Sequence, residues 1–502
     1  MRCKKFYAAA FAALLGAACG AAFADVPDNG RFAKARAMIL DLIQNANVPS
    51  ISVAVAQHGK ILWEESFGWA DRERLIKATP DTMYSIASTS KPLTATGLMV
   101  LAERRKIELD KDVNTYLGGA RLTPVDPSWP APTVKHVMNH TAGLPLHYQF
   151  FYENEPYRRP AMEETIRRYG ILLRRPGEFY FYSNLGFGII DFIIGRVSGR
   201  GYADFMRTDV FLPLGMTRTS VGIGPGLEGF AARRYDEKQL PIPFYTFDHD
   251  GASAIFTSAH DLIRFGMFQL KDHPAGAKAV LSDATIDLMQ DPKATTAPQR
   301  NYGLGWAIHE DDCGYKTIVH GGGMPGVSTD LKLLPTEDLA VVMLCNISNS
   351  KAYTIKEEII GTLVPKYGEK YRAKMQAPPV APAPFTPPAA LVGEWRGGIH
   401  TYSGIQSAGL SIRENGEVKV TMFGQMSTLL NMVEFKDDIL QGACYGTIKT
   451  EDAARAPHYL MFGVHLEGDT LTGLVAAMAD TPPAFALSSW IQLKKVAAPP
   501  AR

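Results

Sequence analysis

The sequence predicts an α/β protein in which helices flank an antiparallel sheet and form an added helical lobe, followed by a C-terminal all-β domain. Strand-like runs at 50–69 and 304–345 enclose a long mixed segment, and this order favours one sheet built from both ends of the region. A Pro/Ala-rich stretch at 371–390 separates this region from a series of short β-like runs. At 502 residues the chain is also too long for one ordinary domain.

The first 24 residues have the pattern of a secretory signal peptide. Basic residues precede the apolar run 6–21, and the tripeptide 22–24 supplies the small residues that cleavage requires. The apolar run is short for a transmembrane anchor. A lipoprotein signal acylated at Cys19 is the weaker alternative, because Gly16 stands where such signals usually carry a larger aliphatic residue. We therefore expect a periplasmic or secreted protein with no membrane span.

Composition excludes several classes of protein. With 46% hydrophobic and 21% charged residues, the chain has the composition of an ordinary globular protein. Its formal net charge of +1 gives no basis for binding nucleic acid. Outside the signal peptide only Cys313, Cys345 and Cys444 remain, so a disulfide framework is not expected. His136 and His140 have metal-like helical spacing but lack the glutamate of a zinc protease, and we interpret both as structural. No cofactor is predicted.

The first predicted elements are a helix and a hairpin. Residues Arg31–Asn45 have the pattern of an amphipathic helix. The strand-like runs Ser50–Gln57 and Lys60–Trp69 are joined by a two-residue His-Gly turn, which is typical of a β-hairpin. A further helix is predicted to open at Ser88 and to run towards Arg105.

The middle of the chain is predicted to form a second lobe. Residues 105–270 are mixed helix and loop, and a lobe made from them would leave a cleft against the sheet. Strand-like runs return after Tyr302, and Pro335–Asp338 makes the turn between the last two of them. A closing helix is predicted at Ile355–Val364. The four strands are Leu304–His309, Lys316–His320, Val327–Leu334 and Leu339–Cys345.

The C-terminal segment is predicted to be all-β. Turn residues at 415–416 and 467–469 each lie between two apolar runs, which is a hairpin signal. The opening segment Leu391–Trp395 resembles the start of a lipocalin-like barrel, with a small sandwich as the alternative. The predicted boundaries are a signal peptide at 1–24, a first domain at 25–370, a linker at 371–390 and a β domain at 391–496.

Ser88-Thr89-Ser90-Lys91 places a serine and a lysine one helical turn apart. A serine hydroxyl is a poor nucleophile at neutral pH and needs a base before it can attack a carbonyl carbon. Because Lys91 lies three residues after Ser88 on a predicted helix, both side chains face the same side. Partial burial would lower the pKa of an unpaired lysine and allow it to accept the serine proton.

Tyr182, which opens the Tyr-Ser-Asn segment ending at Asn184, is a second candidate. It could accept the proton as a phenolate held by Lys91, or relay the proton to the leaving group, and the spacing leaves both roles open. Tyr152 repeats the Tyr-x-Asn spacing without the preceding Pro-Gly-Glu-Phe turn, so we interpret it as a pocket wall. A second Ser-x-x-Lys at 348–351 lacks the later motifs, and we interpret it as a helix cap.

The segment His320-Gly321-Gly322-Gly323 ends a strand-like run. Glycines within a strand reduce stability and indicate that another backbone or a ligand approaches closely. A substrate carbonyl lying there could accept one N–H from Gly323 and another from Ser88, which together would form an oxyanion hole. A glycine-rich turn is the alternative interpretation.

In this order the three motifs resemble those of the serine β-lactamase and penicillin-binding-protein superfamily, most of all the branch that holds class C β-lactamases, D-aminopeptidases and family VIII carboxylesterases. The resemblance spans residues 26–370 and implies a β-lactamase/transpeptidase-like fold. It implies Ser88 as nucleophile, Lys91 as its base or activator, Tyr182 as proton shuttle, Asn184 as a substrate-amide contact and His320 on the substrate-lining strand.

One departure from the superfamily pattern bears on the substrate. True β-lactamases and transpeptidases usually carry Lys-Thr-Gly where this chain has His320-Gly321-Gly322, and the lysine and threonine help to bind a substrate carboxylate. A histidine is mostly neutral at pH 7, and glycine has no hydroxyl. Esters, or amides without that carboxylate, therefore fit better than penicillins. The aromatic segment Tyr148–Tyr157 suits apolar acyl or aryl groups.

Three functions follow as hypotheses. The leading one is a secreted serine hydrolase that forms an acyl-serine intermediate on carboxylic esters, with weak or promiscuous β-lactam activity. The second is a D-amino-acid-specific peptidase or DD-carboxypeptidase acting on peptidoglycan-like peptides, and the third is a non-catalytic penicillin-binding-like receptor. The expected partners are small molecules and not nucleic acid. The sequence leaves the oligomeric state and the role of the β domain open.

Overall fold

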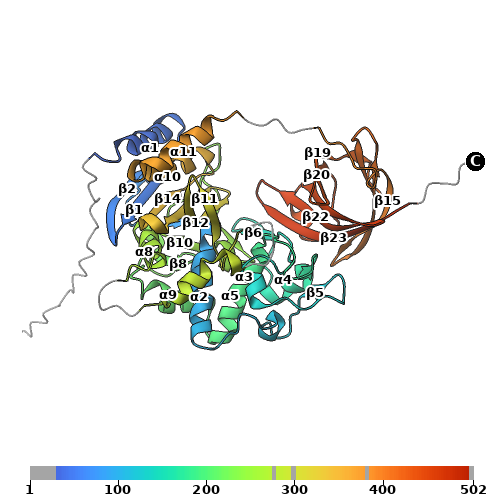
Figure 1. The fold of residues 1–502 in the computed structure, drawn as a ribbon, viewed down its shortest axis with the longest axis horizontal. Coiled ribbons are helices and arrows are strands. Elements are labelled where there is room, and N and C mark those ends of the chain that lie inside the picture. The colour runs from blue at the N-terminus through green and yellow to red at the C-terminus, as the bar shows by residue number, and fades with distance from the viewer. Residues whose placement is uncertain (1–29, 274–278, 295–300, 379–383, 497–502) are drawn as a thin grey trace, which may run out of the picture.

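The computed structural model describes residues 30–273, 279–294, 301–378 and 384–496 (Figure 1). The predicted signal peptide lies outside these residues. A seven-stranded sheet in the order β11-β12-β13-β14-β1-β2-β3 is antiparallel throughout, so strands from both ends of the region form one sheet, as predicted. Its strands are β1 (Ser50–Gln57), β2 (Lys60–Asp71), β3 (Ile76–Lys77), β11 (Ala307–Asp312), β12 (Tyr315–Met324), β13 (Val327–Leu334) and β14 (Leu339–Cys345).

Both faces of this sheet are buried, because its central strands point alternate side chains into two separate cores. Along β1, Val53 and Val55 pack into the core beside α1 and α10, whereas Ala54 and Ala56 belong to the core beside α8. This explains the apolar run 53–56 of β1 and the uninterrupted apolar sequence of β14. The flanking helices are α1 (Ala33–Asn45), α10 (Tyr353–Leu363) and α11 (Pro365–Gln376) over one face and α8 (Ala259–Gln269) over the other (Figure 1).

The middle of the chain forms the predicted second lobe around helix α2 (Ser90–Glu103). Every residue of α2 from Ser90 to Leu101 is buried, because the helix lies between the sheet and the lobe and also contacts α5 and α7. A 3₁₀ turn (η1, Ala87–Thr89) precedes it. The other elements are α3 (Val134–Met138), α4 (Met162–Tyr169), α5 (Asn184–Ser198), α6 (Tyr202–Met206), α7 (Asp250–Ser253), α9 (Asp283–Met289), β4 (Tyr84–Ser85), β5 (Thr123–Pro124), β7 (Ile171–Leu172), β8 (Thr219–Val221) and β10 (Ile255–Thr257).

The C-terminal domain is a nearly closed antiparallel barrel, which confirms the barrel interpretation over the sandwich. The strand path runs β18-β17-β16-β15-β23-β22-β21-β20-β19, and its two end strands are successive in the chain. Thr428 Oγ1 of β18 also donates to the Tyr445 carbonyl of β20 at 3.0 Å. The strands are β15 (Gly393–Thr401), β16 (Gly404–Ile412), β17 (Val418–Met422), β18 (Thr428–Leu429), β19 (Asn431–Lys436), β20 (Ile439–Tyr445), β21 (Tyr459–Glu467), β22 (Thr470–Ala479) and β23 (Phe485–Lys495).

The aromatic segment after residue 147 is a strand and not the loop that its composition suggests. Strand β6 (Tyr148–Tyr152) pairs antiparallel with both β9 (Tyr245–Phe247) and β23. The first region therefore donates a strand to the barrel sheet. Residues 371–376 of the predicted linker belong to helix α11, and residues 379–383 lie outside the described residues.

A buried carboxylate joins the barrel to the helical lobe. Asp452, which has no exposed surface, accepts hydrogen bonds from Tyr157, from Arg168 at 2.6 Å, from Tyr169 at 2.5 Å and from Tyr402 at 2.9 Å. The first three donors belong to the lobe and the fourth to the barrel. Because a buried charge is stable only when it is well paired, this cluster holds the barrel in one place against the lobe.

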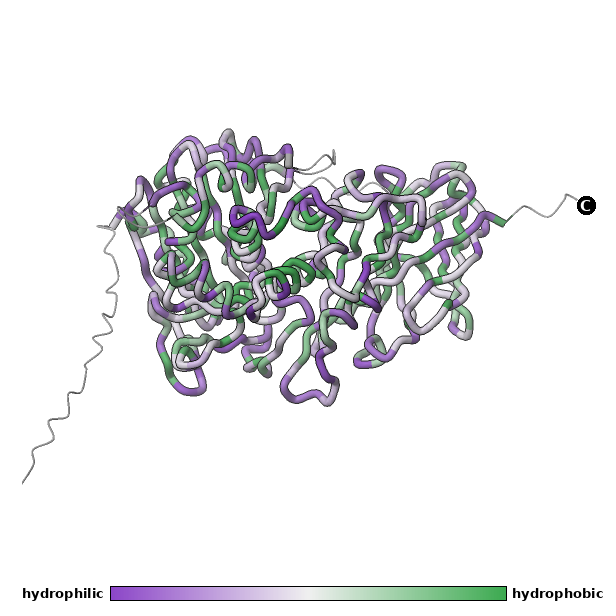
Figure 2. Tube along the Cα trace, turned by 90° about the horizontal axis from the view of Figure 1, so that it is seen from below, coloured by the Kyte–Doolittle hydropathy of each residue, from purple (hydrophilic) through white to green (hydrophobic). Residues whose placement is uncertain are grey.

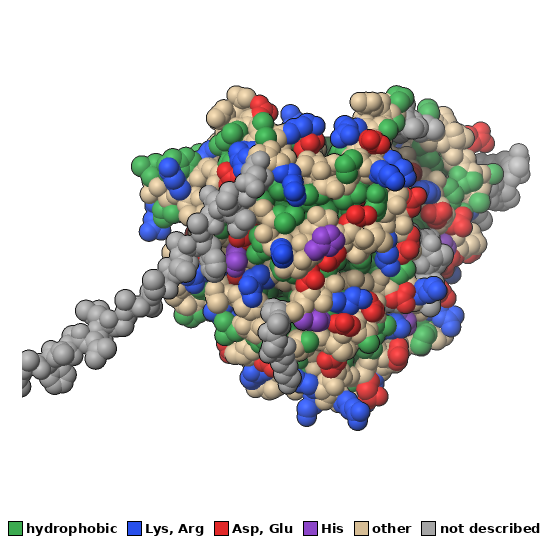
Figure 3. Space-filling view, turned by 60° about the vertical axis from the view of Figure 1, so that its left-hand side comes forward, with side chains coloured by type: hydrophobic (Ala, Val, Ile, Leu, Met, Phe, Trp, Pro, Cys, Tyr) green, Lys and Arg blue, Asp and Glu red, His purple; other side chains and the backbone are tan. Residues whose placement is uncertain are grey.

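Neither hydropathy nor charge marks out one part of the molecule in the views of Figures 2 and 3. Apolar segments run through the interior of both regions, with polar segments along the outer loops (Figure 2), and acidic and basic side chains are interspersed over the face shown in Figure 3. Within the described residues, no helix is both long and apolar enough to cross a bilayer. All three cysteines of this part are free, and the buried Cys345 belongs to the core beside α1 and α10.

Gly322 lets β12 approach the turn that carries Ser88. A Cβ atom at Gly322 would lie 2.1 Å from the Ile86 carbonyl oxygen and 2.5 Å from Thr329 Oγ1. Thr329 Oγ1 in turn donates to that Ile86 oxygen at 2.8 Å, and Thr89 Oγ1 donates to the His320 carbonyl at 3.2 Å. The close backbone approach predicted from the glycine run is therefore real at this position.

Gly322→Ala should destabilise the protein by about 1–3 kcal/mol, because the added methyl group has no room between two backbone segments. Thermal melts monitored by circular dichroism measure the effect. Gly323→Ala is the matched control, since its methyl group would meet only Tyr353 Oη, at 3.8 Å. Equal melting temperatures for the two variants would contradict the prediction.

Candidate active site

Ser88 lies at a strained turn just before α2. The preceding Ala87 has φ of +47°, a left-handed conformation that residues with a side chain seldom adopt. Tyr182 Oη donates a hydrogen bond to Ser88 Oγ at 2.9 Å, and Lys91 Nζ lies 3.0 Å from the same oxygen. The turn thus presents the serine oxygen to two proton-carrying groups at once.

Lys91 is fully buried and has no carboxylate partner. Its Nζ lies 2.8 Å from Asn184 Oδ1 and 3.2 Å from the Ala252 carbonyl oxygen, and burial lowers its pKa well below the usual range. In its neutral form the amine has two protons, which these two acceptors can take, and one lone pair, which is left for the Ser88 hydroxyl. The arrangement suits Lys91 to the role of proton acceptor.

Tyr182 is held as a neutral phenol. Burial raises its pKa above the usual range, and the hydrogen bond with Ser88 offsets this only in part. Its ring packs on that of His140, with centroids 4.4 Å apart, and His140 Nδ1 accepts the Ser183 N–H at 3.2 Å. The two pKa directions favour Lys91 as base and Tyr182 as proton donor, a choice that the spacing of the motifs left open.

The structure confirms the structural reading of two other motifs. His136 Nδ1 accepts the Thr133 N–H and completes the capping box of α3, so it has a structural role in the helix. In the second Ser-x-x-Lys copy, Asn349 Oδ1 accepts the Lys351 N–H at 2.9 Å and caps a 3₁₀ turn.

A cavity of about 240 Å³ lies over the serine, and both lobes and the barrel contribute to it. Ser88, Tyr182 and Asn184 supply its catalytic side, and Gly323 lies among its walls, which is compatible with the predicted oxyanion hole. The remaining lining residues are Tyr148, Phe150, His249, Ser253, Met324, Pro325, Ala479, Asp480 and Ala484.

Three residues of the glycine motif do not line this cavity. His320 is 6% exposed, its Nε2 lies 3.0 Å from Tyr302 Oη, and its Nδ1 donates to the Gly321 carbonyl at 2.9 Å. Burial lowers its pKa to about 3, so the imidazole is neutral. Gly322 faces the Ile86 carbonyl, and the backbone of Gly321 serves His320. The predicted substrate contact of the motif is therefore reduced to Gly323.

Tyr152 is not the pocket wall that its sequence suggests. Its ring is buried and packs against Tyr245 with centroids 5.0 Å apart, because β6 pairs with β9 and carries the end of the strand away from the cavity. Tyr148 and Phe150, on the same face of β6, do line the cavity. The cavity thus has the predicted aromatic wall, but Tyr148 and Phe150 form it in place of Tyr152.

Two parts of the cavity wall escape sequence reasoning. Ala479, Asp480 and Ala484 come from the β22–β23 turn of the barrel, and His249 precedes α7. Nothing in their local sequence indicates a site, since they reach it only through the pairing of β23 with β6 and of β6 with β9.

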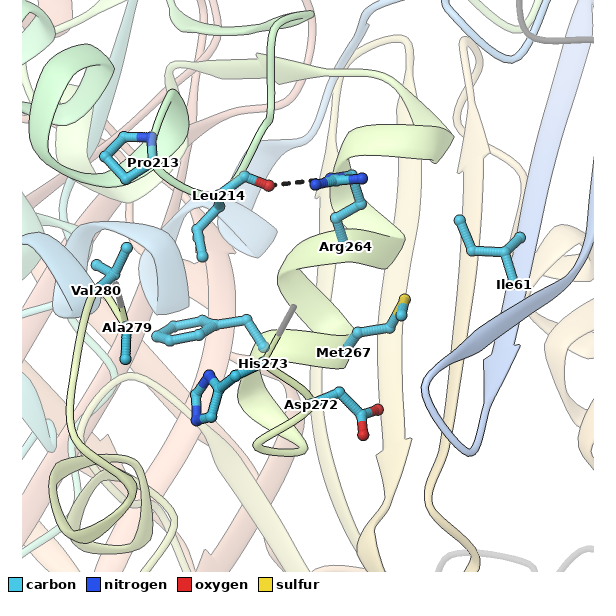
Figure 4. A pocket seen from close by; sticks show the side chains of 10 residues that line it. Ile61, Pro213, Leu214, Arg264, Met267, Asp272, His273, Ala279 and Val280 are labelled. Carbon is cyan, nitrogen blue, oxygen red and sulfur yellow. Dashed lines mark hydrogen bonds between the residues drawn. The ribbon is translucent and has the colours of Figure 1, made fainter. Parts of the chain in front are cut away.

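A second hollow shares no lining residue with the cavity over Ser88 (Figure 4). It has a volume of about 100 Å³ and mostly apolar walls beside α8, including Leu214 and Met267. The Arg264 side chain at this hollow already makes a hydrogen bond, because its Nε donates to the Leu214 carbonyl at 3.0 Å. Among the described residues, no serine, threonine or tyrosine hydroxyl lines it.

An antiparallel sheet with a helical lobe, and a serine held between a buried lysine and a tyrosine, are together the architecture of the serine β-lactamase and penicillin-binding-protein superfamily. The chain belongs to the beta-lactamase family, whose model matches residues 35–361.

Individual relatives agree with this family. The chain is 28% identical over 302 residues to penicillin-binding protein 4* of Bacillus subtilis (strain 168), over 55% of this chain and 64% of that protein. It thus spans a little under two thirds of the length of the first curated relatives it matches. Two solved structures cover the barrel as well. They are the octameric penicillin-binding protein homologue from Pyrococcus abyssi (21% identity, TM-score 0.59, 92% of this chain and 99% of that one) and SurE with D-Leu (19% identity, TM-score 0.60, 93% and 100%).

Lys91→Met should stabilise the fold and abolish the chemistry. A buried amine without a charged partner costs stability, so an apolar side chain of similar length should raise the melting temperature. Acyl transfer should slow by about 10²- to 10⁴-fold, the contribution of a general base. Lys356→Met is the control, because Lys356 Nζ pairs with Asp330 Oδ2 at 2.5 Å and its loss should lower the melting temperature. A lower melting temperature for Lys91→Met would contradict the prediction.

The pH profile of kcat/KM should fall on the acidic side only. Protonated Lys91 cannot accept the serine proton, so kcat/KM for an uncharged ester should fall as the pH drops through the lowered pKa of Lys91. The raised pKa of Tyr182 predicts no matching loss up to about pH 10. Initial rates across this range measure the profile. A basic limb near neutrality would show that the protonated lysine is the active form.

Proposed function

We propose that this protein is a secreted serine hydrolase that transfers the acyl group of a carboxylic ester to Ser88 and then to water, with weak activity on β-lactams. The observation that carries the proposal is the contact of Ser88 Oγ with the buried Lys91, whose pKa is lowered, on one side and with the Tyr182 hydroxyl on the other. The signal-peptide pattern of residues 1–24 supports secretion.

The proposed reaction has two steps. Lys91 Nζ takes the Ser88 proton while Oγ forms a bond to the substrate carbonyl carbon, and the N–H groups of Ser88 and Gly323 stabilise the oxyanion. The carbonyl re-forms, the bond to the leaving oxygen breaks, and Tyr182 passes a proton to that oxygen and regains one from protonated Lys91. Water then attacks the acyl-serine, and the acid and free Ser88 are released.

Charge around the cavity supports an uncharged acyl donor. Among the described residues, no arginine lines the cavity. His320, which stands where the superfamily usually carries a lysine, is neutral and does not line the cavity. The barrel adds the carboxylate of Asp480 to the wall. A penicillin or a peptide C-terminus carries a carboxylate, which this wall would repel. Tyr148 and Phe150 provide apolar surface for an acyl chain.

A peptidase that releases D-amino acids is the second candidate. One solved structure with the same fold over 93% of this chain is SurE with D-Leu, and the carboxylate of Asp480 would suit a substrate ammonium group. The missing cationic partner argues against a DD-carboxypeptidase, whose substrate ends in a carboxylate. A receptor without turnover is the least supported, because each proton-transfer group lies within hydrogen-bond distance of the serine.

Initial rates of the mature chain on three substrates test the proposal. We expect p-nitrophenyl butyrate to be cleaved faster than a chromogenic cephalosporin or D-alanyl p-nitroanilide, and Ser88→Ala to lose at least about 10³-fold. Asp480→Asn should raise the cephalosporin-to-butyrate ratio of kcat/KM by about threefold to tenfold, since it removes the repulsion of the β-lactam carboxylate.

Each other outcome has a meaning. Full activity in Ser88→Ala would overturn the acyl-serine proposal. A preference for the anilide would favour the peptidase, and an unchanged ratio in Asp480→Asn would remove the charge argument. Tight binding of a cell-wall fragment without turnover of any substrate would support the receptor.

A further inference from the structure

Helix α7 has only four residues, and it carries the backbone oxygen that contacts Lys91. The Ala252 carbonyl oxygen lies 3.2 Å from Lys91 Nζ. A helix of this length makes too few internal hydrogen bonds to be rigid by itself, so its position depends on what it packs against. The geometry of the Lys91 contact is therefore set by the residues that hold the peptide groups next to Ala252.

Two different helices hold the two peptide groups of Gly251. Asp191 Oδ2 of α5 accepts the Gly251 N–H at 2.6 Å, and Thr94 Oγ1 of α2 donates to the Gly251 carbonyl at 2.7 Å. All three residues are buried. A Cβ atom at Gly251 would lie 2.5 Å from the Phe187 carbonyl oxygen and 2.8 Å from Asp191 Cβ, so α7 packs directly on α5.

The Thr94 hydroxyl is directed at Gly251 by its other neighbours. It has one proton to donate, and the Gly251 carbonyl at 2.7 Å is a nearer acceptor than the Ser90 carbonyl at 3.0 Å. Tyr202 Oη lies 2.7 Å from Thr94 Oγ1, and burial raises the pKa of Tyr202, so it is a neutral phenol that can donate. The hydrogen bonds therefore run from Tyr202 through Thr94 to Gly251.

Asp191 can hold its peptide group with or without a charge. Burial raises the pKa of Asp191 well above its usual range, and the neighbouring Asp250 adds to this effect. Arg159 acts in the opposite direction and pairs with Asp250 at 2.8 Å. A protonated carboxyl group keeps a carbonyl oxygen that accepts hydrogen bonds, so the contact with the Gly251 N–H does not depend on ionisation.

We infer that Thr94 and Asp191 are positioning residues for Lys91. By fixing the two peptide groups of Gly251, they keep the Ala252 carbonyl against Lys91 Nζ. Without them α7 could shift, and one amine proton would lose its acceptor, so the lone pair would no longer be directed at the serine. This inference rests on the proposed acyl-serine function and concerns the same site.

Thr94→Val tests the inference, because valine keeps the shape of threonine and cannot donate a hydrogen bond. A carbonyl oxygen stabilises a charged ammonium more than a neutral amine, so displacement of the Ala252 oxygen should lower the pKa of Lys91 further. With p-nitrophenyl butyrate, we expect the acidic fall of kcat/KM to move about 0.5–1 pH unit lower and kcat above the fall to drop about tenfold. Thr94→Ser keeps the hydroxyl and should restore both.

Thr96→Val is the matched control on the same helix. Thr96 is also buried, and its Oγ1 donates to the Pro92 carbonyl at 2.9 Å and accepts from Gln269 Nε2 at 3.3 Å. Its loss should leave the midpoint of the acidic fall unchanged. Thermal melts show whether each variant is folded. A purely structural role of Thr94 would lower the melting temperature and leave the midpoint at the wild-type value, which would overturn the inference.

A second pair of variants tests Asp191. Asp191→Asn and Asp191→Ala remove the same ionisable group, but only asparagine keeps an oxygen that can accept the Gly251 N–H. We expect the acidic fall to lie lower, and kcat to be smaller, in Asp191→Ala than in Asp191→Asn. Equal profiles would overturn the role of Asp191. If Thr94→Val does not fold, this pair decides the inference.

The other titratable groups around Lys91 and Asp191 are present in every variant, so a difference between matched variants reports on Lys91. Besides Tyr182, they are the buried His140, His249 and His320 near the lysine, and Asp248, Asp250, Arg159 and Tyr202 near the carboxyl group.

Failure of this inference is distinguishable from failure of the proposed function. An uncharged fluorophosphonate ester forms a bond between Ser88 Oγ and phosphorus and expels fluoride, while the serine proton passes to the base, whichever acyl donor the protein uses. If this probe labelled Ser88 and no ester were hydrolysed, the proposed function would fall, and the pH dependence of labelling would test Thr94→Val in the same way. Ester hydrolysis with equal profiles in all variants would overturn the inference alone. Neither labelling nor hydrolysis would overturn both.

Discussion

The burial of Lys91 without a counter-charge is the constraint on which the rest of the site depends. In water the amine would be protonated and could not accept the Ser88 proton. Burial lowers its pKa, and the Asn184 and Ala252 oxygens direct its lone pair towards the serine. The surrounding structure must therefore keep water and carboxylates away from this nitrogen, which is a demand on packing as much as on chemistry.

The scaffold meets this demand by enclosing α2 from Ser90 to Leu101. The sheet covers one side of the helix and α5 and α7 cover the others, so the lysine side chain has no route to solvent. Gly322 lets β12 close on the turn before Ser88, and the Thr329 hydroxyl ties the Ile86 carbonyl to β13. These contacts lie behind the serine, which leaves its other side open to the cavity.

The C-terminal barrel contributes to the wall of the candidate active site. Its sheet takes up β6 from the helical lobe, and the Asp452 cluster fixes the contact. The β22–β23 turn then places Ala479 and Asp480 opposite the aromatic side chains of β6. The candidate catalytic groups thus come from the first region, whereas the wall of the cavity is shared between that region and the barrel.

Local sequence determined what depends on residues a few positions apart. The serine–lysine spacing at the start of α2, the hairpins of the sheet and barrel, and the close backbone approach at the glycine run could all be predicted, because helix and strand geometry sets those relations. Only the tertiary structure decided which side chains reach the cavity. His320 turns to Tyr302, Tyr152 is carried away by β9, and His249 and Asp480 arrive through strand pairing between distant segments, a register that no local pattern specifies.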